Sequence, residues 1–352
     1  TTKGTIGNIG NVSVKLTGTA GGATATGLKN VTFDARVTAG EVAGKPASTV
    51  NKLGNISVAL TGQDGASVGL DSVNFEGDTI GNTKVTVNRG KATAATAQAA
   101  MGVMYRATNT IGTLSFDGDA TTDQVSGLQV WAGSKVGALT VHAKTAANGS
   151  LVGSDILAGQ SLVLTGATAA DVTTALAGAA LGNVTVSGSL TNTKLVAGAK
   201  IGAVTVGGAA TGSLIVAGAV LDGDFIFDGD ETYQRAASIA SVTVKGAFST
   251  TSIVAGVDPG NSIFGDAGDA LAAVAGVLAD ATSQIGAVTL SGVPTDLIAA
   301  TATTHQYGIE AALLKGIKTG TGVSVTQFPN ALFLDAGPQG EDNADVFVRT
   351  VT

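Results

Sequence analysis

The sequence predicts an all-β fold, a parallel β-solenoid (β-helix) with coils of about 20 residues, short helical insertions and a C-terminal cap. Three observations lead to this prediction. A short apolar motif recurs along the chain, and a second motif follows it at a constant distance. The third observation is the composition: 51 glycines in 352 residues, with only 4% aromatic and 13% charged residues. Because few large side chains are present to fill a wide core, the apolar residues are expected in many thin layers, which stacked coils allow.

The first motif has an aliphatic residue, usually a glycine, a variable residue, and then two apolar residues that flank a small polar one. Successive side chains of a strand point to opposite faces, so Val184 and Val186 point one way and Thr185 points the other. Each copy therefore predicts a half-buried strand. The copies begin at Ile9, Leu53, Ile111, Val136, Leu181, Ile201, Ile239 and Ile285.

The second motif ends in Ala-Gly, as in LVAG at 195–198, LIVAG at 214–218 and SIVAG at 252–256. The next strand of the first type is expected about three residues later, and coils that begin at Leu181, Ile201 and Leu221 set the predicted period. The alternative is an antiparallel sandwich, which also has short alternating strands but seldom keeps a second motif in phase. The expected strand starts after Ala-Gly are Val136, Leu162, Leu181, Ile201 and Leu221.

The chain divides into three predicted parts. Residues 1–110 form irregular N-terminal β coils with insertions, 111–300 the regular solenoid, and 301–352 a C-terminal cap with a terminal strand. Solenoid ends need caps, because exposed strand edges would pair with other chains. Helices are expected at 92–106, 270–283 and 309–315, and late strands at 323–325, 331–334 and 346–351.

Composition and charge exclude several classes of protein. The chain has no cysteine, so disulfides and thiolate metal or redox sites are impossible. A net charge of −7 without basic clusters argues against nucleic acid. No apolar run approaches the length of a membrane span, so a soluble chain is expected. The chain begins at Thr1 rather than Met, as expected after removal of a signal peptide or where a boundary was placed artificially.

Residues 111–352 resemble the large bacterial cell-surface β-strand-repeat proteins. The resemblance lies in the repeated first motif, in IVAGVDPG at 253–260 followed by FGD at 264–266, and in IGAVTL at 285–290 with a late Asp-rich stretch before a terminal strand. It implies a surface, layer-forming or adhesive protein with a parallel β-helix. No catalytic residue carries over from this family. The chain is far shorter than many such proteins, so both a fragment and a self-standing building block remain open.

Acidic residues beside glycines are the candidate metal ligands. Calcium takes six to eight oxygen ligands, and Gly-bracketed Asp pairs on a turn supply several of them. The alternative for each cluster is a solvated turn, since Asp and Gly are favoured there without any ligand. The candidates for calcium, the one expected cofactor, are Asp258, Asp266, Asp269, Asp228, Asp230 and Glu231, and similar loops lie at 75–78 and 116–119.

One hydroxyl residue in most strands of the first type is expected to point outward. Stacked in register, these residues would form a ladder able to bind an ordered surface such as ice. The alternative is a simple β-propensity choice for exposed strand positions. The residues are Ser13, Thr32, Ser57, Thr86, Ser115, Thr140, Thr185, Thr205, Thr243 and Thr289.

We expect an extracellular structural protein, not an enzyme: a rigid scaffold that assembles with copies of itself into a surface layer, sheath or filament, or an adhesin stalk. A cell-surface polysaccharide is a further expected partner. The alternative is a carbohydrate-active β-helix enzyme, a polysaccharide lyase or hydrolase, with Asp228, Asp230 and Arg235 as a partial catalytic set. Its aromatic residues are sparse, and fold analogy alone is no evidence of activity. His142 and His305 are expected to be surface residues.

Overall fold

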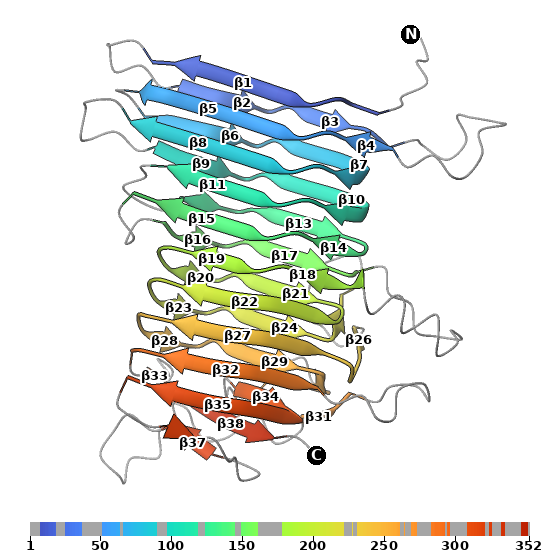
Figure 1. The fold of residues 1–352 in the computed structure, drawn as a ribbon, viewed down its shortest axis with the longest axis vertical. Helices are drawn as coiled ribbons and strands as arrows, with labels where there is room; N and C mark the ends of the chain where they lie inside the picture. Colours follow the sequence, from blue (N-terminus) through green and yellow to red (C-terminus); the bar gives the residue numbers. More distant parts are fainter. Residues whose placement is uncertain are drawn as a thin grey trace, which may run out of the picture.

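The computed structural model describes residues 8–18, 25–36, 51–63, 66–89, 97–118, 124–144, 149–160, 178–221, 227, 231–260, 264, 269–272, 283–292, 294–295, 308–320, 324–325, 332–334 and 346–350. Within these residues the named elements are all β-strands, and no helix is long and apolar enough to cross a membrane. Strands of successive turns of the chain are stacked along the long axis, from the N-terminal end to the C-terminal end (Figure 1). The predicted all-β class with mostly parallel strands is confirmed.

The strands form three rows, each joined by parallel pairing from one turn of the chain to the next. The first row is β1 (Val12–Thr17), β5 (Ile56–Gln63), β8 (Thr83–Arg89), β11 (Leu114–Gly118), β15 (Leu139–Ala143), β19 (Val184–Val186), β22 (Lys200–Val206), β27 (Ser238–Val244), β32 (Gln284–Leu290) and β35 (Leu313–Thr319). Short strands β4 (Lys52–Leu53), β14 (Lys135–Val136) and β18 (Ala180–Leu181) precede it in three turns.

The other two rows follow the same order. The second row is β3 (Thr32–Asp34), β7 (Asn74–Ile80), β10 (Met104–Ile111), β13 (Gln129–Ala132), β17 (Asp155–Ala158), β21 (Lys194–Ala197), β24 (Leu214–Ala217), β29 (Ser252–Ala255), β34 (Gly308–Ala311) and β38 (Val346–Thr350). The third row is β2 (Ala25–Lys29), β6 (Ser67–Asp71), β9 (Ala97–Met101), β12 (Val125–Ser126), β16 (Leu151–Val152), β20 (Leu190–Thr191), β23 (Ala210–Thr211), β28 (Phe248–Ser249) and β33 (Pro294–Thr295).

The first residue of the first motif forms a continuous column that joins the turns. Leu181 and Ile201 are register partners, as are Ile201 and Ile239. Every predicted copy of the motif has its place in the column, and burial of each such side chain stabilises the fold by about 2 kcal/mol. The column contains Ile9, Leu53, Ile80, Ile111, Val136, Leu181, Ile201, Ile239, Ile285 and Leu314.

The glycine in the first motif is explained by close approach between turns. A Cβ at Gly112 would lie 2.8 Å from the carbonyl carbon of Gly81, and one at Gly137 would lie 2.8 Å from that of Gly112. No real Cβ tolerates such contacts, so the backbones can stack this closely only without a side chain.

An asparagine ladder runs beside these glycines. Backbone N–H groups of Asn55 and Asn82 donate to the side-chain oxygens of Asn11 and Asn55, at 2.8 and 2.9 Å. The N–H of Thr113 donates in the same way to Asn82 at 2.8 Å. A later rung joins Ala203 N–H to Asn183 at 3.0 Å, across 20 positions of sequence. The variable residue of the motif therefore satisfies backbone donors at the turn between strands.

The turn from the third row into the second row has a left-handed residue in successive turns of the chain. Gly153 has φ 56° and Asn192 has φ 47°, and the N–H of Gly153 donates to the carbonyl of Thr191 at 2.9 Å. Glycine and asparagine tolerate this conformation best, so the sequence matches the turn at these positions. The full set is Asn30, Ser72, Gly102, Gly127, Gly153, Asn192, Gly212 and Thr250.

The helix predictions are wrong wherever the structure describes the residues. The segment 92–106 contains β9 and the first residues of β10, and the segment 309–315 contains parts of β34 and β35. Alanine and glutamine favour a helix in isolation, but Ala97, Ala99 and Ala100 are fully buried at a place where turns pack closely. Pairing with the preceding turn overrides local propensity. Residues 270–271 form β31, and residues 92–96 and 273–282 lie outside the described part.

The strand predictions fared better. The late strands appear as β36 (Ser324–Val325), β37 (Leu332–Leu334) and β38. The strand start expected at Leu221 is wrong, because β22 pairs with β27 as the next strand of the first row. Leu221 is instead buried outside the column, and Leu162 lies outside the described residues.

Eight of the predicted hydroxyl residues do stand in one row. Ser57, Lys84 and Ser115 are register partners in turn, so Lys84 occupies the place expected for Thr86. Thr32 belongs to the second row of strands, opposite Asn74. The row contains Ser13, Ser57, Ser115, Thr140, Thr185, Thr205, Thr243 and Thr289.

A second apolar cluster covers the outer face of the second row. It includes Leu157, Val196, Val216 and Val254, which alternate with the inward residues of their strands and are nevertheless buried. Two antiparallel hairpins contribute to the cover: β25 (Ala219–Val220) with β26 (Thr232–Tyr233), and β30 (Val257–Asp258) with β31 (Ala270–Leu271). Insertions between coils therefore serve as an outer layer of the fold.

The two ends of the array differ in the described residues. At the N-terminal end, β1, β2 and β3 each have a partner on one side alone, and the inward residues Val12, Val14 and Phe33 are half-buried. At the other end, β36 pairs antiparallel with β35, and β37 pairs antiparallel with β38. Ile317 and Val348 are accordingly buried there.

Candidate functional site

Three of the predicted calcium ligands lie around one tyrosine in the outer layer. Glu231 directly precedes β26, Asp258 ends β30, and Asp269 directly precedes β31. The Tyr233 hydroxyl donates to Glu231 at 3.4 Å. Burial first, then the charges of Glu231 and Asp258, raise the pKa of Tyr233, and the charge of Asp269 adds to the rise. The hairpins therefore gather three carboxyl groups near one half-buried phenol.

These carboxyl groups do not form a metal-ligand set in the residues that the structure describes. Asp258 accepts a hydrogen bond from the N–H of Gly260 at 2.9 Å, which is the geometry of an Asx turn. This contact matches the turn interpretation of the Val-Asp-Pro-Gly segment. Asp228, Asp230 and Asp266 lie outside the described residues, so calcium binding by the full candidate set stays a prediction.

The segments 75–78 and 116–118, expected as acidic loops, lie instead inside β7 and β11, and Asp119 lies outside the described residues. Glu76 forms an ion pair with Arg36, which also pairs with Asp34. Asp78 accepts hydrogen bonds from the backbone and side chain of Asn51 at 2.8 and 3.0 Å. These contacts join residues on either side of positions 37–50, so the part of β7 at 75–78 stabilises the first turns.

The histidines and the partial catalytic set are only in part described. His142 is exposed, as predicted, and its Nδ1 lies 2.9 Å from Asp117. His305, Asp228 and Asp230 lie outside the described residues. Arg235 is half-buried beside the outer layer, and the enzyme alternative therefore stays a prediction.

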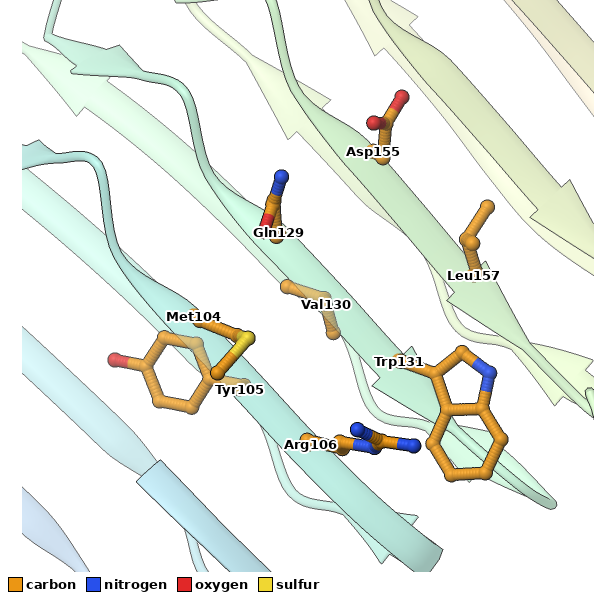
Figure 2. A pocket seen from close by; sticks show the side chains of 8 residues that line it. All are labelled: Met104, Tyr105, Arg106, Gln129, Val130, Trp131, Asp155 and Leu157. Atoms are coloured by element: carbon orange, nitrogen blue, oxygen red, sulfur yellow. The ribbon is translucent and has the colours of Figure 1, made fainter. Parts of the chain in front are cut away.

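A shallow pocket lies on the outer face of the second row, next to the covered patch. It crosses three strands, and its enclosed volume is about 50 Å³, so a ligand would lie against it without being engulfed. Figure 2 shows Arg106 directed toward the indole ring of Trp131, with Gln129 and Asp155 on the neighbouring positions. The lining residues are Met104, Tyr105, Arg106, Gln129, Val130, Trp131, Asp155 and Leu157.

Strand alternation explains the pocket. Tyr105 and Val130 are buried in the core and supply the floor through their backbone, while their neighbours on either side point outward. One wall is the register row Arg106, Trp131 and Leu157, and the other is Met104, Gln129 and Asp155. The pocket is therefore a short groove that runs across the strands, between two rows of side chains.

Of the two charged residues that line the pocket, Asp155 forms an ion pair and Arg106 contacts an aromatic ring. Arg106 carries its guanidinium carbon 5.6 Å from the centre of the Trp131 ring, a cation–π contact. Asp155 forms an ion pair with Lys194 at 3.5 Å. No ion pair to Arg106 is present among the described residues, and its exposed side chain is directed toward Trp131 (Figure 2).

Sequence reasoning missed this pocket because it treated the aromatic residues as scattered. The signal was available in the second motif. Aligning Ala132-Gly133 with Ala158-Gly159 places Trp131 beside Leu157 and Gln129 beside Asp155. Ala107 has no glycine after it, so the same alignment does not extend to Arg106.

No family model, curated protein or solved structure matches this chain. The strand rows described above define a mostly parallel, all-β protein with repeated strands. The resemblance to bacterial cell-surface β-strand-repeat proteins stays a prediction.

Proposed function

We propose that this chain is a parallel β-solenoid that acts as an extracellular structural protein, a stiff body that associates with copies of itself. The support for the solenoid is that successive turns of the chain each add a strand to the same three rows. Inward side chains of these strands stack in columns from one turn to the next. Such an array contacts only its neighbouring turns and resists bending along its axis. Secretion, surface location, and a role in a layer, filament or adhesin stalk belong to the same proposal.

The observation that carries self-association is the N-terminal end of the core, which no strand covers in the part of the chain that the structure describes. Val14 is half-buried, whereas its register partner Val58 is 1% exposed. Phe33 is likewise half-buried above Phe75, which is 0% exposed. Exposed core residues beside strands with unpaired edges favour association with another chain.

The partner that fits this end is a second copy in head-to-head contact. Antiparallel strands β36 and β37 cover part of the C-terminal end, where the described inward residues Ile317 and Val348 are buried. The terminal strand β38 is paired with β34 on one side and with β37 on the other. Both edges of β38 are therefore occupied, and this strand is not available to pair with the sheet edge of a neighbouring copy.

A proline in β1 tests this association. The N–H of Val12 donates to the carbonyl of Asn55, directly before β5, and the N–H of Gly18 donates to that of Thr61 in β5. Strand alternation therefore places the N–H of Lys15 on the opposite edge of β1, which is unpaired in the described residues. Lys15→Pro therefore keeps the bonds to β5 and blocks pairing at the open edge. Lys15→Ala is the matched control, since it removes the side chain and keeps the N–H.

The measurement is light scattering behind size-exclusion chromatography, with negative-stain images of the peak. We expect the unaltered protein and Lys15→Ala to form assemblies, and Lys15→Pro to run as a single chain with an unchanged melting temperature. A single chain for the unaltered protein at every concentration, or equal assembly of both variants, contradicts the proposal.

A further inference from the structure

The geometry points to a glycan-binding subsite at the Trp131 pocket, which holds one pyranose ring of an acidic polysaccharide. The ring lies against Trp131, and its carboxylate pairs with Arg106. This inference does not depend on self-association: the pocket lies on the outer face of β10, β13 and β17, away from the open end of the array.

The apolar part of the recognition comes from the indole. Trp131 is half-buried and packs at the margin of the outer apolar cluster, which fixes its position. Sugar rings present C–H bonds on one face, and the electron-rich face or rim of an aromatic side chain is a suitable surface for them. Leu157 continues the wall of Trp131, and Met104 adds an apolar side chain on the opposite wall.

The polar part comes from the exposed Gln129 and the half-buried Asp155 on the opposite wall. A pocket that is mainly apolar with a few fixed polar groups is typical of small-ligand sites. An amide and a carboxylate can together donate to and accept from ring hydroxyls. Because Asp155 is held by Lys194, its orientation is set before a ligand arrives.

The acidic character follows from Arg106. Its guanidinium is exposed, lies beside the indole and has no carboxylate partner among the described residues. A planar guanidinium pairs with a carboxylate through two parallel hydrogen bonds. A uronate ring supplies both that carboxylate and an apolar face, so it can contact Arg106 and Trp131 together.

The shape of the groove favours a polymer over a free sugar. It is open at the surface, so a polymer can continue above the protein on either side of the ring that lies in the groove. The next outward residue on the N-terminal side is Glu76, already paired with Arg36, and on the C-terminal side Val196 is covered. These residues bound the groove at both ends, so it accommodates one ring, at Trp131.

Trp131 is the only tryptophan of the chain, so its fluorescence reports on this pocket directly. Titration of the full chain with pentagalacturonate is expected to change the emission in a saturable way, and maltopentaose, its neutral counterpart of equal length, is expected to bind at least about tenfold more weakly. Arg106→Gln is expected to weaken pentagalacturonate about tenfold and to leave maltopentaose unchanged.

Lys84→Gln is the matched control, because it removes one exposed positive charge from the first row of strands. It should change the affinity by less than about twofold. Calorimetry with Trp131→Ala, which is expected to abolish binding, checks the aromatic contact. The inference is overturned if the emission does not respond to pentagalacturonate, if both oligosaccharides bind equally, or if Lys84→Gln weakens binding as much as Arg106→Gln.

Discussion

Val196 and Val216 are register partners in β21 and β24, and both are buried although their side chains point away from the core column of Leu195 and Ile215. Their exposed fractions are 0% and 1%. The hairpins of the outer layer therefore stabilise the array from outside. Val216→Asp would place an unpaired carboxylate in this apolar layer, and we expect it to lower the free energy of unfolding by about 3 kcal/mol.

Urea unfolding followed by circular dichroism measures this effect. Thr185→Asp is the control, since it introduces the same carboxylate at an exposed outward position of β19. Its cost is expected to stay within about 0.5 kcal/mol. Equal effects of the two substitutions would show that the outer layer contributes nothing.

This outer layer also marks the limit of what the sequence could predict. The first motif located the inward column, because a period of two and a regular glycine identify a half-buried strand. It missed Ile80 and Leu314, since Thr83 takes an apolar position after Ile80 and Lys315 replaces the glycine after Leu314. The run Leu195-Val196-Ala197 predicts burial on both faces, yet nothing in it tells which segment covers Val196.

The site was less predictable than the fold for a related reason. Arg106 and Trp131 are 25 positions apart and meet only through the register of β10 and β13, which depends on the length of the intervening loop. The acidic clusters were visible as turns in the sequence. Whether their carboxyl groups converge depends on hairpins such as β30–β31, whose pairing a local pattern does not specify.

At one turn position, the energetic cost of the left-handed backbone conformation can be measured without any steric clash of the added side chain. Gly153 has φ 56°, and a Cβ there would meet no atom within 4 Å. Gly153→Ala is therefore expected to cost about 1 kcal/mol, purely because alanine disfavours this backbone conformation. The measurement is the midpoint of urea unfolding.

Gly10→Ala provides the comparison. A Cβ at Gly10 also meets nothing within 4 Å, and its φ lies outside the left-handed region. We expect no loss of stability there. A loss at Gly10 equal to that at Gly153 would contradict the conformational explanation.

The asparagine ladder makes a further prediction about the turns. Asn55 accepts the N–H of Asn82 at 2.9 Å, so Asn55→Ala removes a bond between two turns. A loss of about 1 kcal/mol in the free energy of unfolding is expected. Asn88→Ala, at an exposed position of β8, is the control and should change stability by less than half as much.

Calcium is tested by thermal unfolding with and without a chelator. If the candidate cluster that includes Asp258 and Asp269 binds calcium, EDTA is expected to lower the melting temperature, because a ligand that binds only the folded state stabilises it. Asp258→Asn should reduce that shift. An identical melting temperature in EDTA and in excess calcium would reject the calcium prediction.

Tyr105 predicts how stability responds to alkaline pH. The ring is fully buried between Phe75 and the core, and burial raises the pKa of its hydroxyl, an effect only partly offset by the neighbouring Thr83 hydroxyl. The unfolded chain releases this proton near pH 10, whereas the folded chain retains it. The protonated form therefore stabilises the fold fully below about pH 10, and stability falls as the pH rises toward the folded-state pKa.

Tyr105→Phe isolates this contribution, because every other titrating group is unchanged. Since the Tyr105 oxygen is buried and makes no hydrogen bond of good geometry, the substitution should change stability by less than about 1 kcal/mol at pH 7. Above pH 10 the variant should lose stability less steeply than the unaltered protein, with a slope smaller by about one proton. Parallel stability curves from pH 7 to pH 11.5 would mean that the folded and unfolded chains release the Tyr105 proton at the same pH, which would contradict burial of this hydroxyl.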